Sequence, residues 1–241
     1  MSLNNFDGDT FVAFIDISGF SKMMIESDEK AINALNLFYQ VGFDTIKKFR
    51  SESKFIDGLF ISDSGIIYYN KSKEKLYQNL TNVDRLLILL SSLEEIHKSM
   101  LLKRYLINSS VSYGYVRFTK KIETSGISKN PIYGKAYVSA YRDNESGHPK
   151  INPGECRILI DSLPKDIKNF LENENENIFK INRISKKAND KNHLYFYWML
   201  DDLELSVEFD TKYKRIYESR YDSIIDLLDE KWGDLRSINI K

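Results

Sequence analysis

The sequence predicts an α+β fold, in which a central sheet is covered by long amphipathic helices. Residues 11–20 form a run in which seven of ten side chains are apolar, and the β-branched and aromatic residues in it favour a buried strand. Two later segments carry apolar residues at steps of three and four, the spacing of a helix with one buried face. The predicted order of these elements is strand, helix, strand, strand, helix, strand.

The first helix is predicted to begin at Ser27 and Asp28, which are common helix caps, and to run to about Arg50. Basic residues gather at its C-terminal end, where the helix dipole favours them. Residues 54–61 and 64–69 then resemble two apolar strands with only Ser62 and Asp63 between them. So short a connection predicts a tight hairpin.

A second long helix is predicted from about residue 73 to 103, followed by a β-rich run from Tyr105 to Phe118. Gly114 interrupts that run, which indicates a bulge or a close backbone approach. A polar loop at 120–131, a short helix at 134–145 and a strand at 156–161 complete the core. A βαββαβ order predicts the ferredoxin-like arrangement, one sheet with its helices on a single face.

The C-terminal part is predicted to extend this core. Residues 172–177 alternate Glu and Asn and indicate a solvated loop, and an aromatic strand is expected at 193–200. A last amphipathic helix is expected between Tyr213 and Leu235, packed either on its own sheet or against a partner helix. We therefore divide the chain into a core, 1–162, and an extension, 163–241, that completes the same domain.

Composition excludes several classes of function. The 241 residues carry 35 basic and 35 acidic side chains, which argues against a nucleic-acid binder that works through a strong positive field. Cys156 is the only cysteine, so the chain has no internal disulfide and no cysteine-based zinc site; its apolar strand predicts a core position. No run of about 18 uncharged apolar residues predicts a membrane span, and a cytoplasmic protein is the simplest interpretation.

Two acidic residues interrupt otherwise apolar strand segments. Asp16 ends the first strand and Asp63 lies at the hairpin tip, and in a βαββαβ sheet these strands are neighbours. The two carboxylates are therefore expected to converge, as hard-oxygen ligands for Mg²⁺ or Mn²⁺ beside a Gly-containing turn that presents backbone amides to a polyphosphate. Taken separately, a cap for Asp16 and a turn preference for Asp63 explain these residues equally well.

The segments around these acids resemble motifs of the class III nucleotidyl cyclases. Residues 14–20, Phe-Ile-Asp-Ile-Ser-Gly-Phe, are similar to the first metal motif of that family, and residues 61–65, Ile-Ser-Asp-Ser-Gly, to the second. Residues 133–142 resemble the segment that carries its transition-state side chains. The resemblance covers about residues 10–162 and implies the catalytic fold of that family.

Within the family, the variants look most like the pyrimidine cyclases of bacterial anti-phage (Pycsar) systems, which make cyclic UMP or cyclic CMP for a separate effector. Four segments carry this likeness: the Ser-Asp-Ser form of the second motif, residues 112–114, the Tyr-Gly-x-Ala…Ala-Tyr…Glu segment ending at Glu145, and residues 157–161. The purine-reading positions are not kept, because Leu59 stands for a Lys, Pro131 for an Asp and Val138 for the transition-state Asn.

The resemblance also implies a mechanism and a set of site residues. Asp16, Asp63 and the carbonyl of Ile17 would hold two ions, and Arg142 would stabilise charge on the α-phosphate. Backbone amides of Ser18, Gly19 and Phe20 would bind the β- and γ-phosphates, with Lys191 as a further phosphate ligand. The arginine comes from the other subunit in related cyclases, so a head-to-tail homodimer is expected. A helix arginine paired with Asp143 or Glu145 is the alternative for Arg142.

Three functions stay open at this point: a pyrimidine cyclase, a cyclase acting on ATP or GTP through an unusual pocket, and a catalytically silent module that dimerises or senses a nucleotide. Other candidates are weaker. His97, between Glu95 and Lys98 on a helix, is expected on the surface, and His148 and His193 have no partner visible in the sequence. Tyr39, Phe43 and Phe60 would either wall a base pocket or pack as core.

Overall fold

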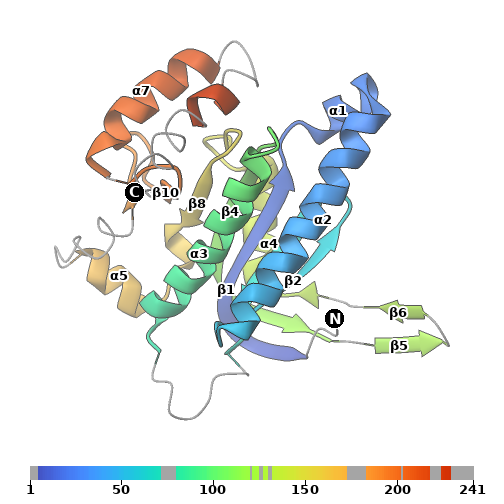
Figure 1. Cartoon of the computed structure of the whole chain (residues 1–241). Coiled ribbons are helices and arrows are strands. Elements are labelled where there is room, and N and C mark those ends of the chain that lie inside the picture. The colour runs from blue at the N-terminus through green and yellow to red at the C-terminus, as the bar shows by residue number, and fades with distance from the viewer. Residues whose placement is uncertain are drawn as a thin grey trace.

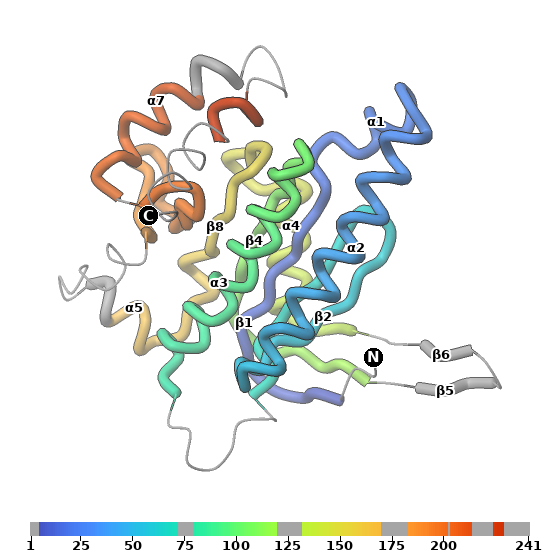
Figure 2. Tube along the Cα trace, viewed as in Figure 1, coloured from blue at the N-terminus to red at the C-terminus, as the bar shows by residue number. Residues whose placement is uncertain are grey.

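The fold is described from a computed structural model of the chain. The description covers residues 5–71, 80–119, 121–124, 127–129, 132–172, 183–201, 203–217 and 224–228. Figure 1 shows the arrangement of the elements, and Figure 2 traces the same view along the chain.

One large sheet organises the molecule, in the order β2-β3-β1-β4-β8-β10-β9, with β7 paired to β4. The pairs are antiparallel except for β4 and β8, which are parallel. The strands of this sheet are β1 (Phe6–Ile17), β2 (Ile56–Ile61), β3 (Ser64–Tyr69), β4 (Ile107–Phe118), β7 (Ile132–Tyr133), β8 (Cys156–Leu159), β9 (Ile184–Ser185) and β10 (His193–Phe196). The longest strands, β1 and β4, lie side by side at its centre (Figure 2).

The helices begin and end close to the predicted limits where both can be compared. They are α1 (Phe20–Glu26), α2 (Asp28–Ser51), α3 (Asn82–Leu101), α4 (Lys135–Ser146), α5 (Lys165–Glu172), α7 (Ser206–Tyr217) and the 3-10 turns η2 (Ile160–Ser162) and η3 (Leu203–Leu205). The side chain of Ser27 caps α2 by accepting from the Lys30 amide, as its sequence predicts. Thr81 and Asp84 form a reciprocal capping box at the start of α3.

The side chains of β1 alternate between the two faces of the sheet and contribute to a separate hydrophobic core on each face. Phe11, Ala13 and Ile15 face a core shared with α2 and α3, whereas Val12 and Phe14 face a smaller core shared with α4. Figure 1 shows α2 and α3 in front of β1 and α4 behind it. The predicted α+β class and the βαββαβ core are confirmed, but the expectation of helices on a single face is wrong for α4.

Two glycines bring α4 close to the central strand. Gly134 has φ 141°, and a Cβ there would lie 2.2 Å from the carbonyl oxygen of Tyr115, so no larger residue fits. Gly114 has φ 145° and lies opposite Thr10 in an unbroken β1–β4 register, so it is not a bulge. A Cβ on Gly114 would contact Ala136 at 3.8 Å, which agrees with the predicted close approach.

Other details differ from the sequence prediction. The segment expected as a polar loop contains two short paired strands, β5 (Lys121–Thr124) and β6 (Ile127–Lys129). The strand expected at 156–161 ends at Leu159 and continues as η2, because Ile160 turns out of the sheet. The beginning of the helix expected from 73, Pro131 and most of the segment 172–177 lie outside the described residues, as do parts of the last helix, whose described portions are α7 and helical residues 224–228.

Residues of the extension belong to the same sheet as the core, because β10 pairs with β8 and β9 with β10. None of the described helices combines the length and the apolar character that a bilayer span requires.

Candidate active site

Asp16 and Asp63 lie at the same end of the sheet, as predicted from the strand order. Asp16 is opposite Ser64 in the β1–β3 ladder, and the Ser64 hydroxyl donates to the Asp16 carboxylate at 2.9 Å. Asp63 occupies the two-residue turn before Ser64, and its carbonyl accepts a hydrogen bond from the Ile17 amide at 3.0 Å. The turn is possible because Ser62 adopts a left-handed conformation with φ 54°.

The charge on Asp16 is poorly stabilised by the protein. Burial raises the pKa of Asp16 to about 7, and the carboxylates of Asp63 and Glu145 add to the increase, against the hydrogen bond from Ser64. Within the described part of the chain, neither Asp16 nor Asp63 forms an ion pair with a lysine or arginine. A cation at this end of the sheet would relieve the electrostatic cost of burying ionised Asp16.

The donor groups present fit a divalent cation such as Mg²⁺ or Mn²⁺. Both accept oxygen ligands, and two carboxylates with few protein ligands are typical of sites at which substrate phosphates and water complete the coordination. No group of three or more His, Cys, Asp and Glu side chains in the described ranges is arranged to hold an ion by itself. The two carboxylates by themselves would supply only part of the coordination of such an ion.

The turn after β1 fits the predicted phosphate loop only in part. The Ser18 amide donates to the carbonyl of Leu106 at 2.9 Å and is not free to bind a phosphate, which corrects the prediction for that amide. Gly19 is exposed, with φ 73°, and precedes the first residue of α1, Phe20. The remaining predicted amides, those of Gly19 and Phe20, stand at a helix start, where amides lack intrahelical acceptors.

Arg142 lies on α4, which packs on the face of the sheet that also carries Val12 and Phe14, and its side chain lines a cavity of about 590 Å³. The cavity is bounded by α4, the end of β8 and the start of β10, and its lining residues are Lys135, Ser139, Arg142, Asp143, Ser146, Gly147, His148, Leu159, Asp161, Ser162, Asn192 and His193. Lys191 is exposed on the loop before β10 and does not line this cavity. No described hydrogen bond or ion pair joins Arg142 to Asp16 or Asp63 within this single chain.

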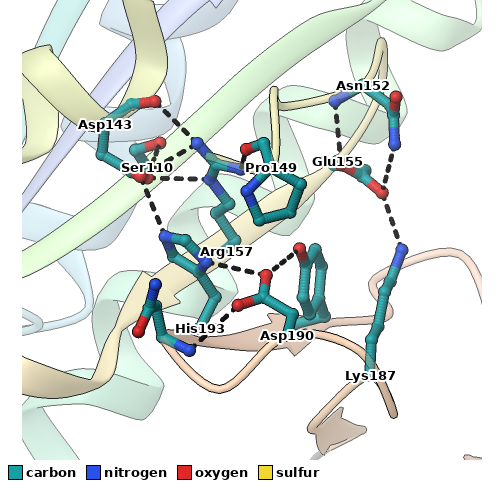
Figure 3. A network of polar contacts seen from close by, with 11 residues as sticks. Ser110, Asp143, Pro149, Asn152, Glu155, Arg157, Lys187, Asp190 and His193 are labelled. Carbon is teal, nitrogen blue, oxygen red and sulfur yellow. Dashed lines mark hydrogen bonds and ion pairs between the residues drawn. The ribbon is translucent and has the colours of Figure 1, made fainter. Parts of the chain in front are cut away.

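A buried ionic network forms the floor of this cavity (Figure 3). The guanidinium of Arg157 in β8 donates to the Asp143 carboxylate at 2.8 and 2.9 Å, so the alternative pairing of Asp143 with Arg142 is not the one formed. Ser110 of β4 also donates to Asp143, at 2.7 Å. His193 contacts Asp143 through one ring nitrogen and Asp190 through the other.

No part of this network was predicted from sequence patterns, although one signal was available. Arg157 stands inside an apolar strand, and a buried guanidinium requires an acidic partner. The surface position expected for His97 is wrong: its side chain is buried, hydrogen-bonded to Ser109 at 2.8 Å and stacked against Trp198. Trp198 comes from the extension, a contact that helical periodicity does not reveal. Cys156 is buried, as predicted.

The positions that read a purine in the resembling family contain no polar group where they are described. Leu59 is half-buried in β2, and Val138 is exposed on α4, with 39% of its surface accessible. The rings of Phe43 and Tyr39 pack against that of Phe60, with centroids 5.3 Å and 6.0 Å away. Phe60 is buried, as core packing predicts, whereas Tyr39 is half-buried and Phe43 is exposed.

No known family model and no curated protein sequence matches the chain. Solved structures do match. The adenylyl cyclase CyaB from P. aeruginosa is 15% identical with TM-score 0.52, over 80% of this chain and 94% of that one. The guanylyl cyclase domain of the RhoGC fusion protein from the aquatic fungus Blastocladiella emersonii is 12% identical with TM-score 0.53, over 80% and 97%. That of RhGC from Catenaria anguillulae, in complex with GTP, is 14% identical with TM-score 0.50, over 80% and 97%. The chain therefore has the fold of the class III cyclase catalytic domain.

Proposed function

We propose that the protein is a divalent-metal-dependent nucleotide cyclase that converts a pyrimidine nucleoside triphosphate, UTP or CTP, into its 3′,5′-cyclic monophosphate and pyrophosphate. The observation that carries the proposal is the pair Asp16 and Asp63, which converge on a fold shared with adenylyl and guanylyl cyclases and form no ion pair with a basic side chain among the described residues. A structural role alone does not explain a half-buried carboxylate at this position whose pKa is raised by its surroundings.

In this proposal, Asp16, Asp63 and the carbonyl of Ile17 hold the metal ions. When bound, the ions would lower the pKa of the ribose 3′-hydroxyl and neutralise the leaving pyrophosphate. The chain's own residues orient the triphosphate: the amides of Gly19 and Phe20 face its outer phosphates, and Ser64 fixes the orientation of the Asp16 carboxylate. The ribose 3′-hydroxyl releases its proton to solvent and its oxygen bonds to the α-phosphorus, while the bond from that phosphorus to the oxygen bridging to the β-phosphate breaks and pyrophosphate leaves.

Arg142 is proposed to act on the nucleotide of a second copy. Its guanidinium would donate to α-phosphate oxygens as charge develops there. The absence of a described contact between Arg142 and the acid pair within one chain supports a head-to-tail homodimer. Exposed apolar residues flank both half-sites: Ile61 beside Asp63, with 59% of its surface accessible, and Tyr141 beside Arg142, with 43%. In this proposal the partner subunit covers both side chains.

The pyrimidine preference rests on the sequence resemblance and on Leu59, whose side chain offers no hydrogen bond to a base where the purine cyclases have a Lys. Lys191 stays a candidate for the triphosphate, exposed two residues before β10. The cyclic product is proposed to act in the cytoplasm as an anti-phage signal on a separate effector that binds cyclic nucleotides.

The test is a product assay with purified protein, Mn²⁺ or Mg²⁺, and each of the four nucleoside triphosphates separately. Cyclic UMP or cyclic CMP as the main product supports the proposal. Cyclic AMP or cyclic GMP would instead identify a purine cyclase, and no product with any substrate would leave a silent cyclase-fold module.

A mixing experiment tests the composite site. Asp63→Ala and Arg142→Ala should each be inactive alone. After the two variants are mixed and allowed to exchange subunits, half of the dimers are heterodimers with one intact site of two, so about a quarter of wild-type activity should return. If activity did not return although differential labelling verified subunit exchange, the composite site would be wrong: Arg142 and Asp63 would act within one subunit, or one of them would not belong to the site.

A further inference from the structure

The network beneath the α4 cavity joins three strands to one helix. Ser110 of β4, Arg157 of β8 and His193 of β10 all donate to the carboxylate of Asp143 on α4. Arg157 also donates to the main-chain carbonyl of Asp143 at 2.6 Å. Figure 3 shows these side chains pointing toward one another from separate elements.

The fit at this point leaves no space for adjustment. Gly147 follows the last residue of α4, and a Cβ there would lie 2.4 Å from the Asp143 carboxylate and 2.5 Å from the Arg157 guanidinium. The side chains of Asp143 and Arg157 are 5% and 0% exposed. Any change in the network must therefore move the C-terminal half of α4.

His193 is the link whose charge can change. Its Nδ1 lies 2.8 Å from the Asp190 carboxylate and its Nε2 lies 2.9 Å from that of Asp143. An ionised carboxylate only accepts hydrogen bonds, so both ring nitrogens must carry a proton and His193 is an imidazolium. The two negative charges, on Asp143 and Asp190, then equal in number the two positive charges on His193 and Arg157.

The donors around the two acids support their ionised state. Asp190 also accepts from the Tyr195 hydroxyl at 2.6 Å and from the Asn192 amide at 2.9 Å. Burial opposes ionisation of Asp143 and Asp190, but hydrogen bonds and neighbouring positive charge outweigh it, and the pKa of each acid is lowered. Burial likewise opposes charge on His193, yet the hydrogen bond and charge of Asp143 raise its pKa overall.

We propose that His193, held as an imidazolium between Asp143 and Asp190, is a positioning residue that fixes α4 and thereby aims Arg142 at the α-phosphate. This inference rests on the proposed function. Arg142 immediately precedes Asp143, so the inward anchor of one sets the direction of the other. His193 and Arg142 line the same cavity. A displacement of about 1 Å at a transition-state ligand costs on the order of 100-fold in rate.

The charged and titratable groups that face His193 come from every element around it. In contact with the network are Asp143 on α4, Arg157 on β8, Asp190 before β10 and Tyr195 on β10, and the charged or titratable groups that line the same cavity are Lys135 and Arg142 on α4, His148 after α4 and Asp161 on η2. Glu155 lies beyond Tyr195 and is paired with Lys187. Loss of the His193 proton removes one donor from Asp143 or Asp190 and leaves the network with an excess negative charge.

Nuclear magnetic resonance of the full chain with ¹⁵N-labelled histidine tests the charge directly. The chain has three histidines, which makes assignment by single His→Gln variants practical. At pH 7.5 His193 should carry protons on both ring nitrogens, whereas His97, whose pKa burial lowers to about 3, should be neutral. A neutral His193 at this pH would overturn the inference.

Kinetics test the positioning role. His193→Gln should lower kcat about tenfold or more with KM changed less than about twofold, because ground-state binding does not require Arg142 in its final position. Lys150→Gln, which removes a positive charge from an exposed site, should leave both constants unchanged.

The pH profile separates positioning from general destabilisation. In the wild type, kcat should fall as pH rises through the pKa of His193, and Asp190→Asn should move that fall to lower pH together with the His193 resonance. An unchanged kcat in His193→Gln, or a profile that does not follow the resonance, overturns the inference while the proposed function stands. A wild-type protein without product from any nucleotide overturns the proposed function instead.

Discussion

Two regions of this molecule withdraw an aspartate from solvent, Asp143 fully and Asp16 in part, and the neighbours of the two carboxylates act on them in opposite ways. Asp143 receives hydrogen bonds from Ser110, Arg157 and His193, and its pKa is lowered despite burial. Asp16 receives one hydrogen bond, from Ser64, has two further carboxylates nearby, and its pKa is raised to about 7. Burial acts in the same direction on both residues, so their partners account for the difference.

The contrast distinguishes an aspartate with a structural role, Asp143, from one that is available to bind a ligand, Asp16. A satisfied charge network fixes elements relative to one another, whereas an unsatisfied carboxylate is an electrostatic cost that a ligand can offset. Perturbed acids of the second kind gather at functional sites. The four predictions that follow break or sharpen this comparison, from the largest expected effect to the smallest.

Removal of the Arg157 guanidinium from the network around Asp143 should lower the stability of the fold more than any other change considered. Arg157→Ala leaves Asp143 buried with its main positive partner gone, and the free energy of unfolding should fall by about 3 to 5 kcal/mol. Urea unfolding followed by circular dichroism measures the change. Arg117→Ala, which removes an exposed ion pair with Asp7, is the matched control and should change stability little. Equal effects of the two substitutions would contradict the structural role of the network.

Removal of the Asp63 carboxylate from the Asp16–Asp63 pair should abolish turnover without unfolding the chain. Asp63→Ala should reduce cyclic nucleotide production by at least about 100-fold, because the metal ions lose a ligand. Asp44→Ala on the exposed face of α2 is the control and should retain full activity. The oligomeric state should be the same in all three proteins. Persistent activity in Asp63→Ala would show that the metal assignment is wrong.

Replacement of aspartate by asparagine should change the free energy of unfolding in opposite directions at Asp16 and at Asp143. In metal-free protein at pH 8, Asp16→Asn should raise the free energy of unfolding by about 1 kcal/mol, since it removes a poorly solvated charge. Asp143→Asn should lower it by about 2 kcal/mol, since Arg157 and His193 then lose their charged acceptor. Parallel denaturant titrations give both values. Two changes of the same sign would refute the comparison.

The smallest expected effect is on the pH dependence of stability, to which two buried histidines contribute with opposite signs. The raised pKa of His193 contributes stability that is complete below pH 6.5 and is lost as pH rises through its folded-state value. The lowered pKa of His97, about 3, contributes stability that is present above pH 6.5 and is lost as pH falls below it.

Thermal unfolding between about pH 5 and 9 checks this pair of slopes. His193→Gln should flatten the alkaline side of the profile, and His97→Gln should flatten the acidic side. If the thermal stability of His193→Gln still fell with rising pH on the alkaline side, that pH dependence would belong to another group.

Local sequence patterns predicted the parts of the fold that depend on neighbouring residues. The Ser27 cap, the hairpin across Ser62 and Asp63, and the buried strand β1 all follow from residues that lie close together in the sequence. The approach of Asp16 to Asp63 was also predictable, because strand order in a βαββαβ sheet brings their ends together. The placement of α4 on the opposite face was not, since its period matches either face.

The buried network could not be predicted because its members come from four separate elements. Asp143, Arg157 and His193 are each ambiguous alone, and the pattern of one element gives no information about a hydrogen bond to another. His97 shows the same limit: its flanking charges predicted exposure, but Trp198 of the extension covers it.

The sequence by itself determined the α+β class, the two long helices and the positions of the two acids, because periodicity and turn chemistry act over a few residues. Only the tertiary structure decided which buried charge has a partner, and so which aspartate is structural and which is available for chemistry. Compensation between charges is a property of distances across the fold, and those distances are set when the sheet and the helices pack together.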